Sequence, residues 1–205
     1  DPDTLFPLQA ALGYDIAQSL FIGNRNILVE GISDFIYLTT ISDHLSSLGR
    51  KSLPLSARLL PAGGATNIPT FIALLGGQLD VVVLIDGSTD KQRIEIAIKR
   101  GRLNAARVIS LDSFATAPTP DIEDLFTPTE YLGFYNETYG ASIKLADLAG
   151  KDRIVARITR HIGAEFNHGL VSATFLRNLD KSIKSLSAAT LDRFEKVIEA
   201  LDRAL

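Results

Sequence analysis

The chain alternates short, fully apolar runs with longer segments in which apolar residues recur at helical spacing. The runs are rich in Val, Ile and Leu and end in turn residues, which is typical of strands buried on both faces of a parallel sheet. Strands are predicted over residues 26–29, 57–60, 80–85 and 106–111, and helices over 33–48, from 66 or 67 to 75, and from about 90 to about 100. The alternation predicts the α/β class, with a central parallel sheet flanked by helices.

Beyond residue 150 the pattern is helical, with little strand character and breaks expected at Gly163, Gly169 and residues 185–187. Apolar residues at helical spacing near the C-terminus predict packing on the sheet domain, and a dimer surface is the alternative. Three parts are therefore expected: an N-terminal helical lead-in (1–24), an α/β domain (25–150) and a C-terminal α-helical appendix (151–205).

Composition narrows the class of protein. With 46% hydrophobic residues, the 205-residue chain has enough apolar material for a core, which excludes disordered and collagen-like classes. No apolar run approaches the roughly 20 residues of a membrane span, so we expect no membrane partner and a cytoplasmic location. The absence of Cys excludes disulfides and thiolate chemistry, and the absence of Met predicts a piece of a longer polypeptide.

A net charge of −3 leaves the chain without the overall positive field that holds nucleic acid by counterion release. If the chain contacts a polyanion, another group must supply positive charge.

Acidic side chains follow the predicted strands. Glu30 follows the first strand, Asp86 and Ser88 follow the third, and Glu123 comes one loop after the fourth. Asp34 lies one helical turn after Glu30. Because ligands of open parallel sheets bind beyond the carboxyl ends of the strands, we expect these groups to collect at one edge. Several oxygen ligands without Cys match a hard divalent ion, Mg²⁺ or Mn²⁺.

Each feature also has a structural interpretation. Asp34 fits a carboxylate that complements the helix dipole, Asp86 begins a common Asp-Gly turn, and Ser88 fits a helix cap. Gly63-Gly64 fits a turn, and no Gly-Lys-Ser/Thr follows to make it a phosphate loop. Their convergence favours function, because carboxylates gathered in one cleft repel one another unless a cation neutralises them.

The ordered motifs resemble a TOPRIM domain, the catalytic fold shared by topoisomerases, bacterial primases and OLD-family (overcoming lysogenisation defect) nucleases. That family has Glu-Gly after its first strand and Asp-x-Asp after its third. Residues 29–34 read Val-Glu-Gly-Ile-Ser-Asp, 61–65 read Pro-Ala-Gly-Gly-Ala, and 121–126 read Asp-Ile-Glu-Asp-Leu-Phe, all similar to the OLD-type branch. The resemblance covers residues 28–126 in motifs, and the helical tail more loosely. It implies a TOPRIM (Rossmann-like) fold.

One position departs from the family pattern, because Ser88 stands where the second Asp is expected. Either Ser88 binds metal directly or through water, or Asp90 or Glu123 compensates, or the second metal site is weak.

The resemblance implies a metal-dependent DNA endonuclease that uses two Mg²⁺ or Mn²⁺ ions, in systems associated with phage interference. In OLD-type nucleases an ABC-like ATPase domain precedes this domain, so ATP is expected to act only through a covalently linked domain outside this chain, and the parent protein is a candidate homodimer. The implied metal ligands are Glu30, Asp34, Asp86, Ser88 and Glu123, with Gly31, Gly63 and Gly64 in the adjoining loops.

A basic group is also expected beside the scissile phosphate. The resemblance assigns this role to His168, after Phe166, and so places His168 with Glu30 and Asp86 among the catalytic residues; a surface or capping histidine is the alternative. Arg58, Lys91 and Arg93 are candidates for phosphate contacts, with a solvated helix face as the alternative. 

Two other functions stay open. A catalytically weakened TOPRIM module for DNA binding or assembly would explain the serine at position 88. A topoisomerase-like or primase-like enzyme uses the same fold, but none of the five Tyr has the sequence context of a strand-passage nucleophile. A dehalogenase-type phosphatase needs Asp after the first strand, where this chain has Glu30.

Overall fold

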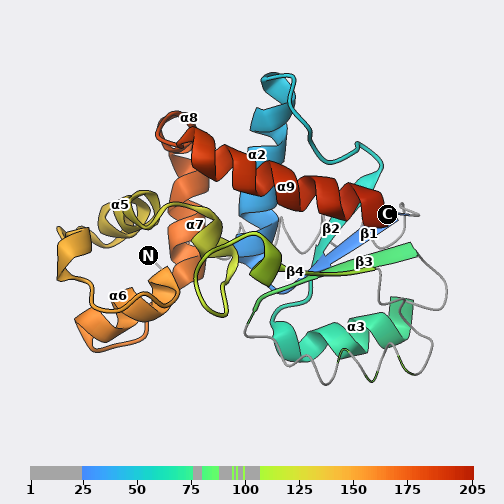
Figure 1. Ribbon diagram of the computed structural model, residues 1–205, viewed down its shortest axis with the longest axis horizontal. Helices are drawn as coiled ribbons and strands as arrows, with labels where there is room; N and C mark the ends of the chain where they lie inside the picture. Colours follow the sequence, from blue (N-terminus) through green and yellow to red (C-terminus); the bar gives the residue numbers. More distant parts are fainter. Residues whose placement is uncertain (1–24, 76–79, 88–93, 95, 97–98, 100–106) are drawn as a thin grey trace.

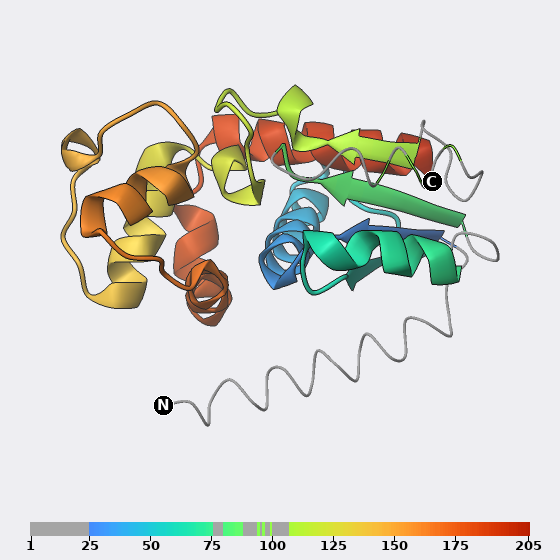
Figure 2. The ribbon, with the colours of Figure 1, turned by 90° about the horizontal axis from the view of Figure 1, so that it is seen from below.

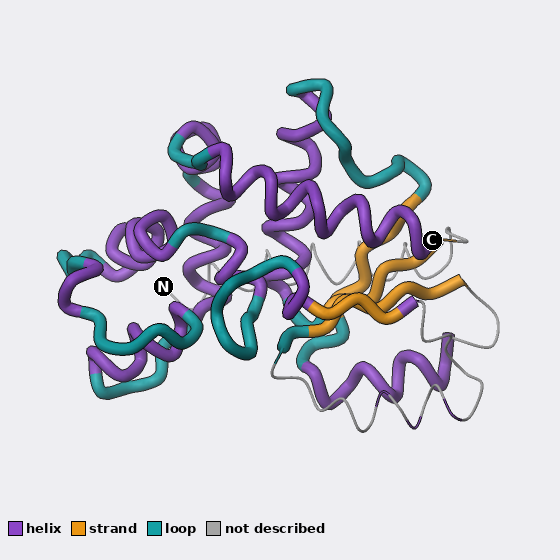
Figure 3. The backbone as a smooth tube through the Cα atoms, viewed as in Figure 1, coloured by secondary structure: helices purple, strands orange, loops and turns teal. Residues whose placement is uncertain are grey.

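The computed structural model describes residues 25–75, 80–87, 94, 96, 99 and 107–205. At its centre is a four-stranded sheet with the strand order β2-β1-β3-β4, in which every neighbouring pair is parallel (Figures 1 and 3). The strands are β1 (Arg25–Val29), β2 (Ala57–Pro61), β3 (Asp80–Ile85) and β4 (Val108–Ser110). The predicted α/β class with a parallel sheet is confirmed, and the topology is consistent with a Rossmann-like fold.

Different helices cover the two faces of the sheet. Ile27 and Val29 of β1 join the core beneath α2 (Ile32–Ser47), whereas Leu28 between them packs with residues of α3 (Ile68–Leu75). Figures 1 and 2 show α2 on one side of the sheet and α3 on the other. Both faces are therefore apolar, which is why the strands appear in the sequence as continuous apolar runs rather than as alternating patterns.

The remaining helices that the structure bounds follow β4 in the chain. They are α5 (Pro128–Tyr139), α6 (Ile154–Ile162), α7 (His168–Arg177), α8 (Leu179–Lys184) and α9 (Ala188–Ala204), with 3-10 turns at Ala65–Asn67, Leu111–Ser113, Ile122–Leu125 and Leu145–Asp147. Helix α7 packs on α2 and α5, and α9 packs on α2 and β3. The buried ring of Tyr37 in α2 contacts those of Phe126 and Phe175, with centroids 4.8 and 5.3 Å away. These contacts hold the C-terminal part of α7, where Phe175 lies, against α2.

The C-terminal breaks were predicted in part. Gly163 ends α6 with a positive φ of 71°, and residues 185–187 separate α8 from α9, as expected. The break at Gly169 was wrong, because this residue lies in the first turn of α7. A Cβ there would lie 3.1 Å from Asn167 Oδ1, which caps the helix, and 3.4 Å from Ile32 Cγ2 of α2, so the glycine lies in a crowded first turn rather than at a helix end.

Helix α5 was not predicted, although Thr127 and Pro128 mark its start. The Thr127 hydroxyl accepts a hydrogen bond from the Glu130 amide, and the Glu130 carboxylate accepts one from the Thr127 amide at 2.7 Å. This reciprocal capping, with Pro at the first helical position, is a strong start signal that the sequence analysis overlooked.

The division of the chain at residue 150 stays a prediction. One core cluster includes residues from β1, α2 and α9, so apolar packing continues from the sheet into the C-terminal helices. The predicted lead-in, residues 1–24, lies outside the described residues. Within the described part of the chain, no helix is long and apolar enough to cross a membrane.

Candidate functional site

The sheet order places the carboxyl ends of β1 and β3 side by side. From β1 the chain crosses to β2 on one side and then returns to form β3 on the other side, so the strand order reverses at this pair. Such a reversal is where open α/β sheets bind ligands. Glu30 follows β1 and Asp86 follows β3, and the Asp86 amide donates a hydrogen bond to Glu30 Oε1 at 2.9 Å. The first two predicted site residues are thus in direct contact.

Asp34 is held near them by the start of α2. Its Oδ2 accepts a hydrogen bond from the Gly31 amide at 2.8 Å, so the predicted helix-start role is real. The side chain is nonetheless buried, at 5% exposure. Burial, with the nearby charge of Glu123, raises the pKa of Asp34 from 3.8 to about 7. Capping of the helix alone would not explain why the Asp34 carboxyl group is buried next to the carboxyl group of Glu123.

Glu123 and His168 approach the same place from the C-terminal half. Glu123 lies in the 3-10 turn Ile122–Leu125 and is 1% exposed, whereas the His168 side chain, in the first turn of α7, is 54% exposed. His168 Nδ1 lies 2.9 Å from Glu123 Oε1. This hydrogen bond raises the pKa of His168 above its ordinary value, so the imidazolium is favoured.

A cleft of about 460 Å³ contains these groups. Eight of the nine predicted site residues line it: Glu30, Gly31, Asp34, Gly63, Gly64, Asp86, Glu123 and His168. We call this the acidic cleft. Ser88, the ninth, and Asp90, Lys91 and Arg93 lie outside the described residues. Arg58 is described but is not among the residues that line the acidic cleft; its Nη1 donates to the carbonyl of Leu55 at 2.8 Å.

The glycine pair after β2 fixes the backbone at Glu30. The Gly64 amide donates to the Glu30 carbonyl at 2.7 Å, and the turn has φ angles of 75° at Gly63 and 123° at Gly64. The Gly64 backbone, with ψ of 152°, is in a region that is open almost only to glycine. The turn therefore positions the Glu30 backbone, and this role explains both glycines.

Gly87 brings a distant loop against the end of β3. Its amide donates to the Pro120 carbonyl at 2.7 Å, and a Cβ at this position would lie 2.7 Å from Thr119 Cα. Thr119 itself has a positive φ of 50°, which is rare for a residue with a branched side chain. This close approach delivers the segment that carries Glu123 to the acidic cleft.

Electrostatic repulsion dominates the acidic cleft. Burial, followed by the charges of Asp34 and Glu30, raises the pKa of Asp86 from 3.8 to about 10. Asp86 Oδ1 is also buried without a hydrogen-bond partner. A buried carboxylate oxygen without a hydrogen-bond donor is costly, so this place in the protein favours a bound proton or a bound cation.

Two residues beside the acidic cleft were not among the predicted site residues, although Asp121 begins the motif at residues 121–126. Asp121 is buried, and burial together with Glu123 raises its pKa to about 10. Arg153 Nη1 lies 3.4 Å from Asp121 Oδ2, and its charge acts to lower the pKa of Asp86, against the larger effects of burial and the neighbouring carboxylates. Position in the sequence offers little signal for this pair, since Arg153 precedes α6 and lies 32 residues after Asp121.

The donor set fits a hard divalent cation. Most of its side-chain donors are carboxylate oxygens, with one imidazole and the polar side chains of Ser33 and Asn167, and Mg²⁺ characteristically binds one or two carboxylates while keeping several waters. Among the described residues, no three His, Asp or Glu side chains are grouped so that they could hold an ion by themselves. The fit is therefore to an ion that completes its shell with water or substrate oxygens.

Comparisons of the chain with protein-family models, with curated proteins and with solved structures found no match.

Proposed function

We propose that this chain is a Mg²⁺- or Mn²⁺-dependent DNA endonuclease whose active site is the acidic cleft. One observation carries the proposal: four acidic side chains from three separate chain segments, Glu30, Asp34, Asp86 and Glu123, line one cleft where the order of a parallel sheet reverses. This arrangement supports the resemblance to the TOPRIM domains of OLD-family nucleases. It is the placement that metal-dependent phosphodiester chemistry requires.

Glu30 and Asp86 would hold one ion, because they follow adjacent strands and are linked through the Asp86 amide. Asp34 and Glu123 would complete the site for a second ion, with Ser88 as a further candidate ligand. Bound ions of this kind lower the pKa of a coordinated water and neutralise charge on a phosphate. They would also supply the positive charge that a chain of net charge −3 lacks.

The protein's own groups would then position the metal ligands and protonate the leaving oxygen. The turn at Gly63 and Gly64 holds the Glu30 backbone, and the Gly31 amide holds the Asp34 carboxylate. The half-exposed side chain of His168 forms its hydrogen bond to Glu123 through Nδ1, so Nε2 does not take part in that hydrogen bond. As an imidazolium it would donate a hydrogen bond, and finally a proton, to the oxygen that leaves the phosphorus.

The wider expectations belong to the same proposal. They are a TOPRIM identity, a linked ABC-like ATPase domain in the parent protein, a role in phage interference and a cytoplasmic location. Their support is the motif resemblance over residues 28–126.

A catalytically weakened module that binds DNA or serves assembly is the second candidate. The serine at position 88, where the family pattern has Asp, favours it. The two functions differ in whether the folded chain cleaves DNA when a divalent metal is present.

The test is cleavage of supercoiled plasmid in Mg²⁺, Mn²⁺, Ca²⁺ or EDTA. Glu30→Gln keeps an oxygen that can accept the Asp86 amide but removes the charge, and Glu199→Gln, at an exposed position of α9, removes the same charge outside the acidic cleft. We expect metal-dependent nicking that Glu30→Gln abolishes and Glu199→Gln leaves unchanged. A folded wild-type chain that nicks in none of the metals would favour the binding module instead.

A further inference from the structure

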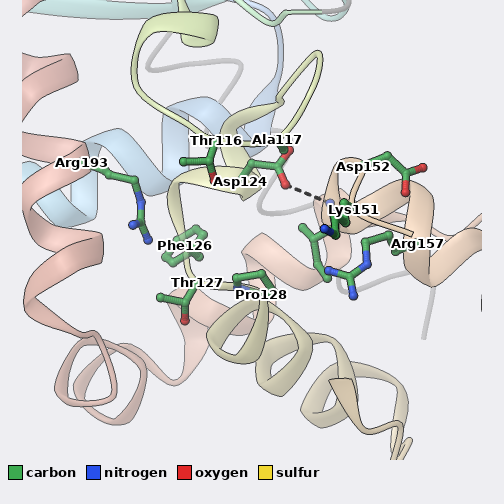
Figure 4. A pocket seen from close by; sticks show the side chains of 11 residues that line it. Thr116, Ala117, Asp124, Phe126, Thr127, Pro128, Lys151, Asp152, Arg157 and Arg193 are labelled. Carbon is green, nitrogen blue, oxygen red and sulfur yellow. Dashed lines mark hydrogen bonds between the residues drawn. The ribbon is translucent and has the colours of Figure 1, made fainter. Parts of the chain in front are cut away.

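A second cavity lies on the other side of the turn that carries Glu123. Whereas Glu123 lines the acidic cleft, the next residue, Asp124, lines a pocket of about 300 Å³. Three basic side chains reach this pocket from separate elements: Lys151 before α6, Arg157 in α6 and Arg193 in α9. Figure 4 shows Arg193 on one side and Lys151 and Arg157 on the other, with Phe126 and Thr127 between them. We call it the basic pocket.

Hydrogen bonds hold the two guanidinium groups and leave donors unused. Arg193 donates from Nε to the Leu125 carbonyl at 2.6 Å and from Nη2 to Thr190 Oγ1 at 3.1 Å. Arg157 donates from Nη2 to the Leu148 carbonyl at 3.1 Å, while its Nε is buried without a partner. A buried, unpaired donor of a charged group calls for an acceptor.

The two carboxylates of the basic pocket are already engaged. Asp124 accepts the Ile154 amide at Oδ1 (2.9 Å) and the Asp121 amide at Oδ2 (3.1 Å), and Figure 4 shows it turned toward the start of α6. Asp152 forms an ion pair with Arg160. The three basic side chains that line the basic pocket therefore outnumber its two carboxylates, and Asp152 is shared between Arg160 and the charge of Arg157.

Planar guanidinium groups and a flexible ammonium are the usual ligands of a phosphate group. We propose that the basic pocket binds a backbone phosphate of the DNA strand next to the phosphate that is cleaved in the acidic cleft. The assignment of DNA rests on the proposed function. The two cavities share the 3-10 turn Ile122–Leu125, since Glu123 lines the acidic cleft and Asp124 lines the basic pocket, so they are adjacent in the fold.

The test compares Lys151→Gln with Lys184→Gln. Both lysines are exposed and the substitutions remove the same charge, but Lys184, at the end of α8, does not line the basic pocket. Arg157→Gln is a second variant, with circular dichroism to check its fold. Binding of a labelled duplex is followed by fluorescence anisotropy in EDTA and in Ca²⁺ over a series of salt concentrations.

We expect Lys151→Gln and Arg157→Gln each to raise the dissociation constant about tenfold at low salt. The slope of log K against log salt should become shallower by about 1 for each. Lys184→Gln should match the wild type. The inference would be overturned if all three variants had the DNA affinity and salt slope of the wild type. It would also be overturned if the wild-type chain did not bind DNA.

Two further arms separate the possible failures. Inorganic phosphate is titrated into the wild type and Lys151→Gln by calorimetry. If Lys151→Gln weakens phosphate binding but leaves DNA affinity unchanged, the occupant is a small phosphorylated molecule and the DNA assignment is wrong. Plasmid cleavage in Mn²⁺ is measured on the same samples. If DNA binding depends on Lys151 but no cleavage occurs, the basic pocket is supported and the nuclease proposal is rejected. If cleavage occurs but DNA binding does not depend on Lys151, the nuclease proposal is supported and the basic pocket is rejected.

Discussion

Replacing Asp86 by asparagine should stabilise the metal-free protein while destroying its proposed activity. The Asp86 carboxyl is surrounded by Asp34, Glu30 and Glu123, and its Oδ1 is buried without a partner. Its pKa is raised from 3.8 to about 10, so at neutral pH the folded chain must keep a proton that the unfolded chain releases. Asparagine resembles the protonated side chain and carries no such linkage.

The sign and size follow from the two pKa values. The folded state binds one more proton than the unfolded state between pH 3.8 and about 10. The free energy of unfolding therefore falls by about 1.4 kcal/mol for each pH unit in that window. From 3.8 to pH 7 the loss amounts to about 4 kcal/mol. This is an upper value for Asp86→Asn, because Asp34 and Glu123 share the same repulsion.

Urea unfolding in EDTA measures the effect. Asp86→Asn should exceed the wild type by about 2 to 4 kcal/mol at pH 7 and by less than about 1 kcal/mol near pH 4. Asp43→Asn, at an exposed position of α2, is the matched control and should change neither value. Added Mg²⁺ should stabilise the wild type and Asp43→Asn but not Asp86→Asn, and so narrow the difference in stability between the wild type and Asp86→Asn. A destabilised Asp86→Asn at pH 7, or a gap that does not depend on pH, would refute the reasoning.

Three other substitutions test the parts of the site. His168→Gln should lower the cleavage rate about a hundredfold with DNA affinity unchanged, because it removes the proton donor held by Glu123; an unaltered rate at pH 7 would contradict that role. Gly87→Ala should destabilise the fold by about 3 kcal/mol in urea unfolding, since its Cβ would lie 2.5 Å from Pro120 Cδ, and a neutral effect would show that the loop can retreat. Gly64→Ala should cost about 1 to 3 kcal/mol through its φ of 123°, measured in the same way, and a loss below about 0.5 kcal/mol would mean that the turn adapts.

The acidic cleft could be predicted from the sequence because two of its acidic residues directly follow buried strands. Glu30 and Asp86 come immediately after apolar runs that are unmistakable as strands, and parallel pairing brings the ends of such strands to one edge. Asp34 follows from helix geometry one turn after Glu30. For these positions the local pattern determines the place in space.

Other parts depend on loop paths that no local pattern describes. Asp121 lies close to Arg153 because the chain before the turn Ile122–Leu125 packs against Gly87 at Thr119. The basic pocket combines residues of α6 and α9 whose separation in the sequence carries no periodic signal. Gly169 was misread because a glycine in the first turn of a helix looks the same in the sequence as a glycine that ends a helix.

The central claim is that the carboxylates at the ends of β1 and β3 hold a divalent ion. Titration of Mn²⁺ into the metal-free chain, followed by electron paramagnetic resonance, tests it without relying on any substrate. The account predicts saturable binding by the wild type and by Glu199→Gln, weakened more than about tenfold by Glu30→Gln, which removes the charge beside Asp86. Equal binding by Glu30→Gln, or no binding by the folded wild type, would contradict it.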